Sequence, residues 1–176
     1  METRLVGCSG LRVSRLGLGT MTWGRDTPAE NAHALLEMFC EAGGTLIDTA
    51  AAYGAGDAER IVGRLVREQG IRDEVVIATK AGFVIRNGKR IVDTSRRALL
   101  RDLEGSLRRL QSDYIDLWQI HAWGDAPLEE SLEAIDHAVS TGRVVTTERN
   151  PCQKPGQRGA PRPRLGERAG SIRLAR

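Results

Sequence analysis

The sequence has few aromatic residues, no long apolar runs and no paired cysteines. Aromatic residues make up only 4% of its 176 residues, so a folded core must be built mainly from aliphatic side chains. No apolar run approaches the roughly 20 residues that a membrane-spanning helix needs, and no apolar segment of a secretory signal is visible. The three cysteines have no paired spacing, which is typical of free thiols in a reducing compartment. We therefore expect a cytoplasmic protein with no membrane partner and no metal site.

The excess positive charge is concentrated in one part of the sequence. The formal net charge is +3, yet residues 145–176 carry eight lysines or arginines against two glutamates, together with four prolines and four glycines. This segment has no hydrophobic periodicity and cannot bury enough apolar surface to offset its chain entropy. We expect residues 1–144 to form the folded domain and residues 145–176 to be a disordered basic tail. Because the tail has no aromatic side chains for base stacking, we expect no nucleic acid partner.

Strand-like and helix-like patterns alternate along residues 1–144, after a short hairpin formed by Leu5–Gly7 and Leu11–Val13. The strand patterns lie at residues 16–20, 45–48, 75–80 and 114–121. The helix patterns begin near Asp26, Asp57, Thr94 and Leu128. A strand followed by a helix, four times over, predicts parallel βαβ units. Two α/β architectures satisfy this pattern, an open doubly wound sheet and a (β/α)8 barrel.

Three of the strand patterns end at a titratable residue. These residues are Asp48, Lys80 and His121, and Tyr53 follows Asp48 in the loop of the same βα unit. Functional groups of parallel α/β folds gather at the carboxyl ends of the strands. We therefore expect these four side chains to share one pocket, although each alone is also typical of a loop cap, an ion pair or a structural aromatic.

The four side chains form a coherent acid–base set. A tyrosine hydroxyl has an ordinary pKa near 10, and a nearby ammonium group lowers it. A carboxylate keeps the ammonium charged and in place, and an imidazole can donate a hydrogen bond to a carbonyl oxygen. This set suits protonation of a carbonyl group while a cofactor delivers hydride to its carbon.

Four segments of the sequence resemble the motifs of the aldo/keto reductase family. They are Gly17–Gly24, Gly43–Gly54, Ala78–Lys80 and Asp113–His121. The resemblance implies a truncated (β/α)8 TIM barrel, with about four βα units and an N-terminal β-hairpin. A dinucleotide-binding Rossmann fingerprint is disfavoured, because the glycines at positions 17 and 19 have no third glycine at the required spacing.

The resemblance also implies an activity, which is NADPH-dependent reduction of aldehydes and ketones to alcohols. Tyr53 would be the general acid, Lys80 and Asp48 would adjust its acidity, and His121 would orient the substrate oxygen. The residues expected near the nicotinamide ribose are Gly19, Thr20, Met21 and Asp48. The residues expected to face the small carbonyl substrate are Trp23, Tyr53 and His121, although Trp23 could equally be a partly exposed loop aromatic.

The resemblance covers only the N-terminal half of the family's fold and ends near Val144. In the family, most contacts to the adenosine, the 2′-phosphate and the pyrophosphate of NADPH come from the other half. The first and fourth barrel strands would then be open edges, which invite self-association. Two alternatives therefore stay open: a catalytically inactive truncated or frameshifted fragment, and a half-barrel interaction module.

Overall fold

The sheet at the centre of the molecule follows the order of the chain. The computed structural model describes residues 1–147. The parallel strands, in their order across the sheet, are β3 (Gly17–Gly19), β4 (Leu46–Asp48), β5 (Val76–Ala81), β8 (Ile115–Ile120) and β9 (Val144–Thr147). Each strand therefore pairs with the one that precedes it in this series. The parallel α/β arrangement confirms the alternating pattern, and the half-barrel is the form that the family resemblance implies.

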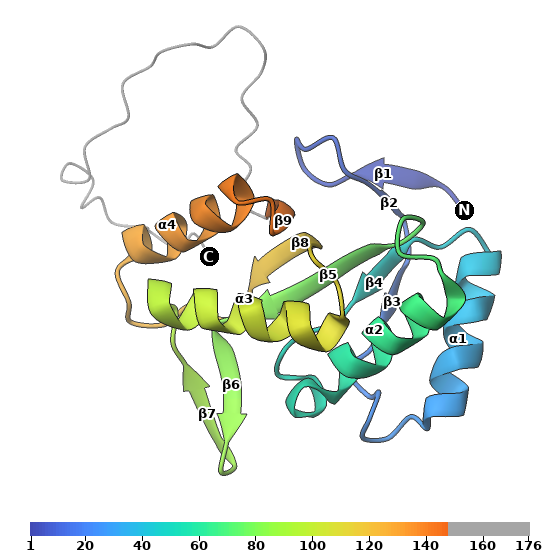
Figure 1. Ribbon diagram of the computed structural model, residues 1–176, viewed down its shortest axis with the longest axis horizontal. Helices are drawn as coiled ribbons and strands as arrows, with labels where there is room; N and C mark the ends of the chain where they lie inside the picture. The colour runs from blue at the N-terminus through green and yellow to red at the C-terminus, as the bar shows by residue number, and fades with distance from the viewer. Residues whose placement is uncertain (148–176) are drawn as a thin grey trace, which may run out of the picture.

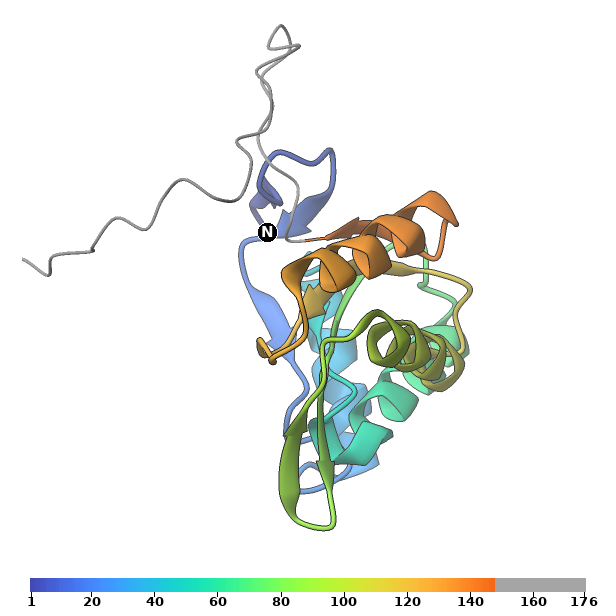
Figure 2. The same ribbon diagram turned by 90° about the vertical axis from the view of Figure 1, so that its left-hand side faces the viewer.

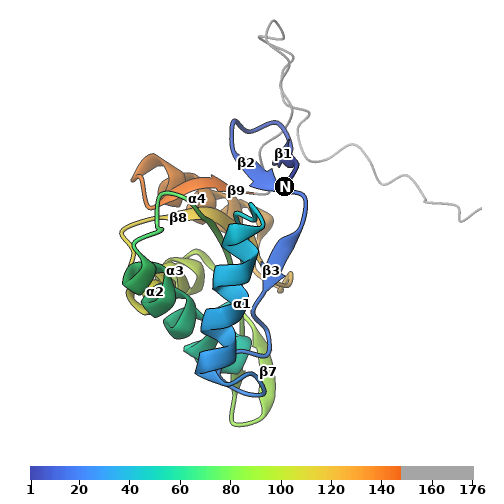
Figure 3. The same cartoon turned by 90° about the vertical axis from the view of Figure 1, so that its right-hand side faces the viewer.

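Helices fill the connections between the strands and lie on one face of the sheet (Figure 1). They are α1 (Ala29–Glu41), α2 (Asp57–Gln69), α3 (Arg96–Leu110) and α4 (Leu128–Ser140). Because successive strands add in a single direction and βαβ connections are right-handed, every helix is brought to the same side. Figure 3 shows α1 running alongside β3, at one edge of this layer.

Two antiparallel hairpins project from opposite ends of the sheet (Figure 2). The pair β1 (Thr3–Leu5) and β2 (Arg12–Ser14) precedes β3, as the sequence pattern predicts within two residues. The pair β6 (Phe83–Arg86) and β7 (Lys89–Val92) follows β5 and has no counterpart in the predicted pattern. Its turn, Asn87–Gly88, has φ angles of 50° and 72°, and an Asn-Gly pair at such angles is the usual two-residue hairpin turn.

The core between sheet and helices is aliphatic, as the shortage of aromatic residues requires. Its largest members that are fully buried come from several elements: Leu36, Ile47, Leu65, Ile77, Leu99, Ile115, Trp23 and Trp118. Two large apolar side chains of α1 lie on its exposed side, since Leu35 is 44% exposed and Met38 is 66% exposed. The first strand is also less buried than its pattern suggests, because β3 is an edge strand.

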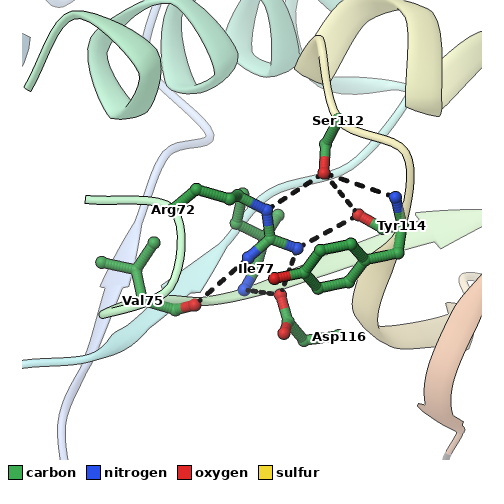
Figure 4. A network of polar contacts seen from close by, with 6 residues as sticks. All are labelled: Arg72, Val75, Ile77, Ser112, Tyr114 and Asp116. Atoms are coloured by element: carbon green, nitrogen blue, oxygen red, sulfur yellow. Dashed lines mark hydrogen bonds and ion pairs between the residues drawn. The ribbon is translucent and has the colours of Figure 1, made fainter. Parts of the chain in front are cut away.

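The amino ends of β5 and β8 are joined by a polar network around Arg72 (Figure 4). Its guanidinium donates to Ser112 Oγ at 3.0 Å and to the carbonyl oxygen of Tyr114 at 3.1 Å. It also pairs with Asp116 at 2.8 Å and lies 3.9 Å from the centre of the Tyr114 ring. The same carboxylate accepts a hydrogen bond from the Ile77 backbone N–H at 2.9 Å. The network therefore connects the loop before β5 to both strands.

Several predicted boundaries differ from the structure. The strand at Val144 continues to Thr147 as β9, so ordered structure extends three residues beyond the predicted domain boundary, and the open sheet edges are β3 and β9. Helix α1 begins at Ala29, three residues after the start expected near Asp26, and Pro28 at its N-cap makes no side-chain capping bond. The rest of the predicted disordered tail, from residue 148, lies outside the described residues.

Two further expectations concern cysteines and membranes. Cys40 is a free thiol whose pKa is raised by burial, and then by the nearby Glu74 carboxylate. Within residues 1–147, no helix combines the length and the apolar character needed to cross a membrane.

Candidate active site

The carboxyl edge of the sheet carries the four predicted acid–base residues. Asp48 is the last residue of β4, Lys80 lies near the end of β5, and His121 directly follows β8. The His121 backbone N–H donates to the carbonyl oxygen of Ala81 at 2.9 Å, which continues the pairing between these strands by one residue. Because the strands are parallel and adjacent, their ends bring the three side chains to one place.

Lys80 is the centre of this cluster. Its Nζ donates to Asp48 Oδ1 at 2.6 Å, to the Thr49 carbonyl oxygen at 3.0 Å and to Tyr53 Oη at 3.4 Å. The Lys80 side chain is 16% exposed, whereas that of Asp48 is 40% exposed. An ammonium group has three N–H donors, and these three contacts use all of them. Lys80 is thus fixed between the carboxylate and the phenol.

His121 lies against the aromatic ring of Tyr53. The ring centres are 5.9 Å apart in an edge-to-face arrangement, and the Phe83 ring lies 5.1 Å away on a tilted plane. The pKa of His121 is lowered by burial first and by the positive charge of Lys80 second, against the opposing effect of Asp48. Burial and the Lys80 charge thus both favour the neutral imidazole over the charged form. Its Nδ1 atom is buried without a hydrogen-bond partner among residues 1–147.

The turn that presents Tyr53 has an unusual backbone. Tyr53 begins a short 3-10 helix, η1 (Tyr53–Gly56), and its N–H donates to the carbonyl oxygen of Ala50 at 3.0 Å. The next three residues, Gly54 to Gly56, have φ angles of 56°, 53° and 94°. Residues other than glycine rarely adopt φ angles in this left-handed region. A Cβ at Gly56 would also lie 2.6 Å from Cδ of Arg109. The glycines therefore allow the chain to turn directly into α2.

The residues predicted to contact a nicotinamide ribose lie beside Asp48. Gly19 is paired with Asp48 in the β3–β4 ladder, and the Thr20 N–H and Oγ1 both donate to the Asp48 carbonyl oxygen, at 3.0 and 3.1 Å. Met21 follows and is 57% exposed. A half-exposed carboxylate can accept from ribose hydroxyls, and an exposed methionine can contact a flat ring. Asp48 and Met21 fit the nicotinamide end of such a cofactor, whereas the Thr20 side chain is buried and supports the backbone of Asp48.

Trp23 differs from the other predicted site residues. It is 1% exposed and belongs to the hydrophobic core, so its side chain packs inside the structure. Its backbone lies beside the turn that carries Tyr53, since a Cβ at Gly54 would lie 3.4 Å from the Trp23 carbonyl oxygen. A role for Trp23 in substrate contact stays a prediction.

The sequence pattern did not identify a buried glutamate behind the site. Glu59 on α2 is 0% exposed, accepts a hydrogen bond from Thr79 Oγ1 at 2.6 Å and pairs with Arg109 Nε on α3 at 2.6 Å. Thr79 immediately precedes Lys80, so this network fixes the strand that carries the central ammonium group. A possible signal was the position of Glu59 beside Ala58 and near Val62, on the apolar face of the helix.

No metal site accompanies this cluster in the part of the chain that the structure describes. Residues 1–147 contain no group of three histidine, cysteine, aspartate or glutamate side chains arranged to hold a metal ion.

Comparisons with known proteins agree with this geometry. The model of the aldo/keto reductase family matches residues 15–146. The aldo-keto reductase YhdN of Bacillus subtilis is 39% identical over 154 residues, and the L-glyceraldehyde 3-phosphate reductase of Escherichia coli is 37% identical over 151 residues. A solved structure of the holo form of aldo-keto reductase AKR11C1 from Bacillus halodurans superposes with a TM-score of 0.76 at 35% identity.

The matches cover most of this chain but only part of each relative. They include 82% of this chain and 45% of YhdN, 82% of this chain and 44% of the Escherichia coli reductase, and 84% of this chain and 49% of the solved structure. The chain thus spans about half the length of the relatives it matches.

Proposed function

Since this chain belongs to the aldo/keto reductase family, we propose that it carries the catalytic side chains for NADPH-dependent reduction of aldehydes or ketones. The observation that carries the proposal is the position of Lys80 Nζ, within reach of both Asp48 and the Tyr53 hydroxyl. Family members reduce carbonyl groups in general. The particular substrate, cofactor and residue roles described below are part of the proposal.

Tyr53 is the general acid in this mechanism. Its hydroxyl gives a proton to the carbonyl oxygen of the substrate, and the phenolate left behind is stabilised by the Lys80 ammonium group at 3.4 Å. Asp48 holds that ammonium group at 2.6 Å and keeps it charged. Because one lysine contacts both groups, the positive charge stays beside the tyrosine oxygen throughout the proton transfer.

His121 positions the substrate oxygen. A neutral imidazole has one N–H donor, and the lowered pKa of His121 favours this neutral form. The edge-to-face contact with Tyr53 places the imidazole beside the phenol. Both side chains can therefore donate a hydrogen bond to the same carbonyl oxygen. His121 and Tyr53 together would thus contact the substrate, with Trp23 as a further candidate.

The bound cofactor would supply hydride to the carbonyl carbon. Within this chain, Gly19, Thr20, Met21 and Asp48 would hold its nicotinamide ribose. The chain spans about half the length of its relatives, so we propose that residues outside the described part, or on another chain, hold the phosphates and the adenosine. The catalytic half-domain that we propose extends through β9, to Thr147.

The competing proposal is an inactive half-barrel. It rests on two observations. The chain covers only 45% to 49% of the length of its relatives, and within residues 1–147 the edge strands β3 and β9 each pair with a strand on one side only. Open parallel edges favour association with another chain. The two proposals differ in one measurable property, which is binding of NADPH by the isolated chain.

The deciding experiment is a titration of the purified chain with NADPH, followed by energy transfer from its three tryptophans to the nicotinamide. Saturable binding, together with reduction of a simple aldehyde, supports the catalytic proposal. A folded chain that does not bind NADPH supports the inactive half-barrel.

The role of Tyr53 has a matched control in the same chain. Tyr53→Phe should slow carbonyl reduction by about a hundredfold to ten-thousandfold, the usual contribution of a general acid. Tyr114→Phe changes the only other tyrosine, which lies in the network at the opposite end of the sheet, and should leave the rate unchanged. Equal losses in both variants would contradict the role assigned to Tyr53.

A further inference from the structure

A cavity of about 340 Å³ lies between α3 and the turn that carries Tyr53. One wall is a single face of α3, where Arg101, Gly105 and Arg108 follow one another at helical spacing. The opposite wall consists of the small loop residues Ala51, Ala52 and Ala55, and the β6 hairpin closes one side. None of these residues takes part in the proton transfer proposed above.

Small residues on both walls leave the space that forms the cavity. Gly105 is buried, and a Cβ at this position would already approach Arg109 Nη1 to 3.0 Å. Alanines provide the facing wall. Arginines lie before and after Gly105 on the same helix, and their side chains border an open space. A larger residue at position 105 would fill this space.

The side chains that line the cavity carry a net positive charge, even when the ion pairs among them are taken into account. Three arginines line it, against one carboxylate, Asp102. That carboxylate accepts from Arg101 at 3.1 Å and from the Gly82 N–H at 3.3 Å, so both of its oxygens are engaged. Arg109 is held by the buried Glu59 at 2.6 Å. Arg108 is exposed and makes no ion pair within residues 1–147.

We propose that this cavity binds a phosphate-type oxyanion. Guanidinium groups offer planar pairs of N–H donors that match a phosphate, and a concave site lined by charges of one sign concentrates the opposite charge. Arg108 supplies a cation with no ion-pair partner within residues 1–147, and Arg101 and Arg109 keep N–H donors beyond those used by their carboxylates, since each guanidinium has five. A phosphate here would lie beside the turn that presents Tyr53.

The test is titration of the purified chain with inorganic phosphate, followed by isothermal calorimetry in a chloride buffer of constant ionic strength. Arg108→Gln and Arg101→Gln should each weaken phosphate binding by about tenfold, the loss expected for one charged hydrogen-bonding partner. Arg97→Gln is the matched control, because Arg97 lies exposed on α3 but does not line the cavity. Circular dichroism of each variant shows whether the fold is retained.

Each outcome decides the proposal. Loss of binding in the two cavity variants, with binding kept in the Arg97 variant, supports it. No heat of binding in the parent chain, or equal weakening in all three variants, overturns it. A second titration with glycerol phosphate identifies the source: tighter binding than inorganic phosphate assigns the site to a phosphorylated small molecule, and weaker binding assigns it to the free ion.

Discussion

The two ends of the sheet each hold a cation paired with an aspartate, yet they are built differently. At the amino end, Arg72 and Asp116 have side chains that are 21% and 11% exposed, and backbone groups of both strands complete their hydrogen bonds. At the carboxyl end, Lys80 is 16% exposed but Asp48 is 40% exposed. One end is closed and fully bonded, and the other is open to a ligand.

The difference separates stability from chemistry. A parallel α/β sheet places functional groups at the carboxyl ends of its strands, whereas residues at the amino ends support the fold. The closed network uses its ions to fix loops to strands. The open cluster leaves a buried His121 Nδ1 without a partner within residues 1–147 and a carboxylate facing solvent. Mutations at the two ends should therefore have opposite consequences for stability and for ligand binding.

The largest expected loss of stability is at the closed end. Asp116→Ala leaves the Arg72 charge and the Ile77 N–H without their partner, and should lower the free energy of unfolding by about 3 kcal/mol. Urea denaturation measures this loss. Glu104→Ala is the control, because its pair with Arg143 is exposed on both sides and should cost less than about 1 kcal/mol. Similar losses in both variants would contradict the comparison.

A smaller loss is expected behind the open end. Glu59→Gln keeps a partner for the Thr79 hydroxyl but removes the charge that compensates Arg109, and should cost about 2 kcal/mol of unfolding free energy. Pairing this change with Arg109→Gln should recover part of the loss, which a double-mutant cycle measures. A full sum of the two single losses would show that the pair is not coupled.

The open cluster itself should contribute little to stability. Asp48→Ala removes an exposed partner, while Lys80 keeps its bond to the Thr49 carbonyl oxygen, so the expected loss is below about 1 kcal/mol. Thermal unfolding of this variant beside Asp116→Ala tests the comparison directly. A larger loss from Asp48→Ala than from Asp116→Ala would invert the assignment of the two ends.

The smallest expected effect is a pH dependence from His121. Its pKa in the folded chain lies below the ordinary value of 6.5, so between these two values the unfolded chain binds more protons. The free energy of unfolding should then fall as the pH decreases from 6.5 through this window. His121→Gln should reduce this dependence, and the exposed His33→Gln is the control. If the free energy of unfolding depends on pH in the same way in His121→Gln as in the parent chain, the lowered pKa of His121 is contradicted.

The features that could be predicted from the sequence are those that depend on the pattern of neighbouring residues along the chain. Apolar runs that stop at Asp48, Lys80 and His121 identify both the strands and the residues at their ends. The hairpin at Phe83–Val92 was missed, although the Asn-Gly pair in its turn is a recognisable signal. The exposure of Leu35 could not be predicted, because helical spacing shows a face but not whether another element covers it.

The polar networks were not predictable for a different reason. Glu59 and Arg109 are 50 positions apart, and Arg72 is 42 positions from Tyr114. Such pairs depend on how α2, α3 and the loop before β5 pack together. A charged residue at a helix surface has the same local pattern whether its partner is water or a buried carboxylate.

The order of the sheet has a consequence for synthesis on the ribosome. Because β3, β4, β5, β8 and β9 pair in chain order, each new strand can join an edge that is already exposed when it emerges. Domains form from the N-terminus onward during translation, and within residues 1–147 each strand of this sheet after β3 pairs with one that has already been made. We expect Asp48, Tyr53, Lys80 and His121 to be assembled once β8 has left the exit tunnel, so a nascent chain of this length already carries its complete acid–base cluster.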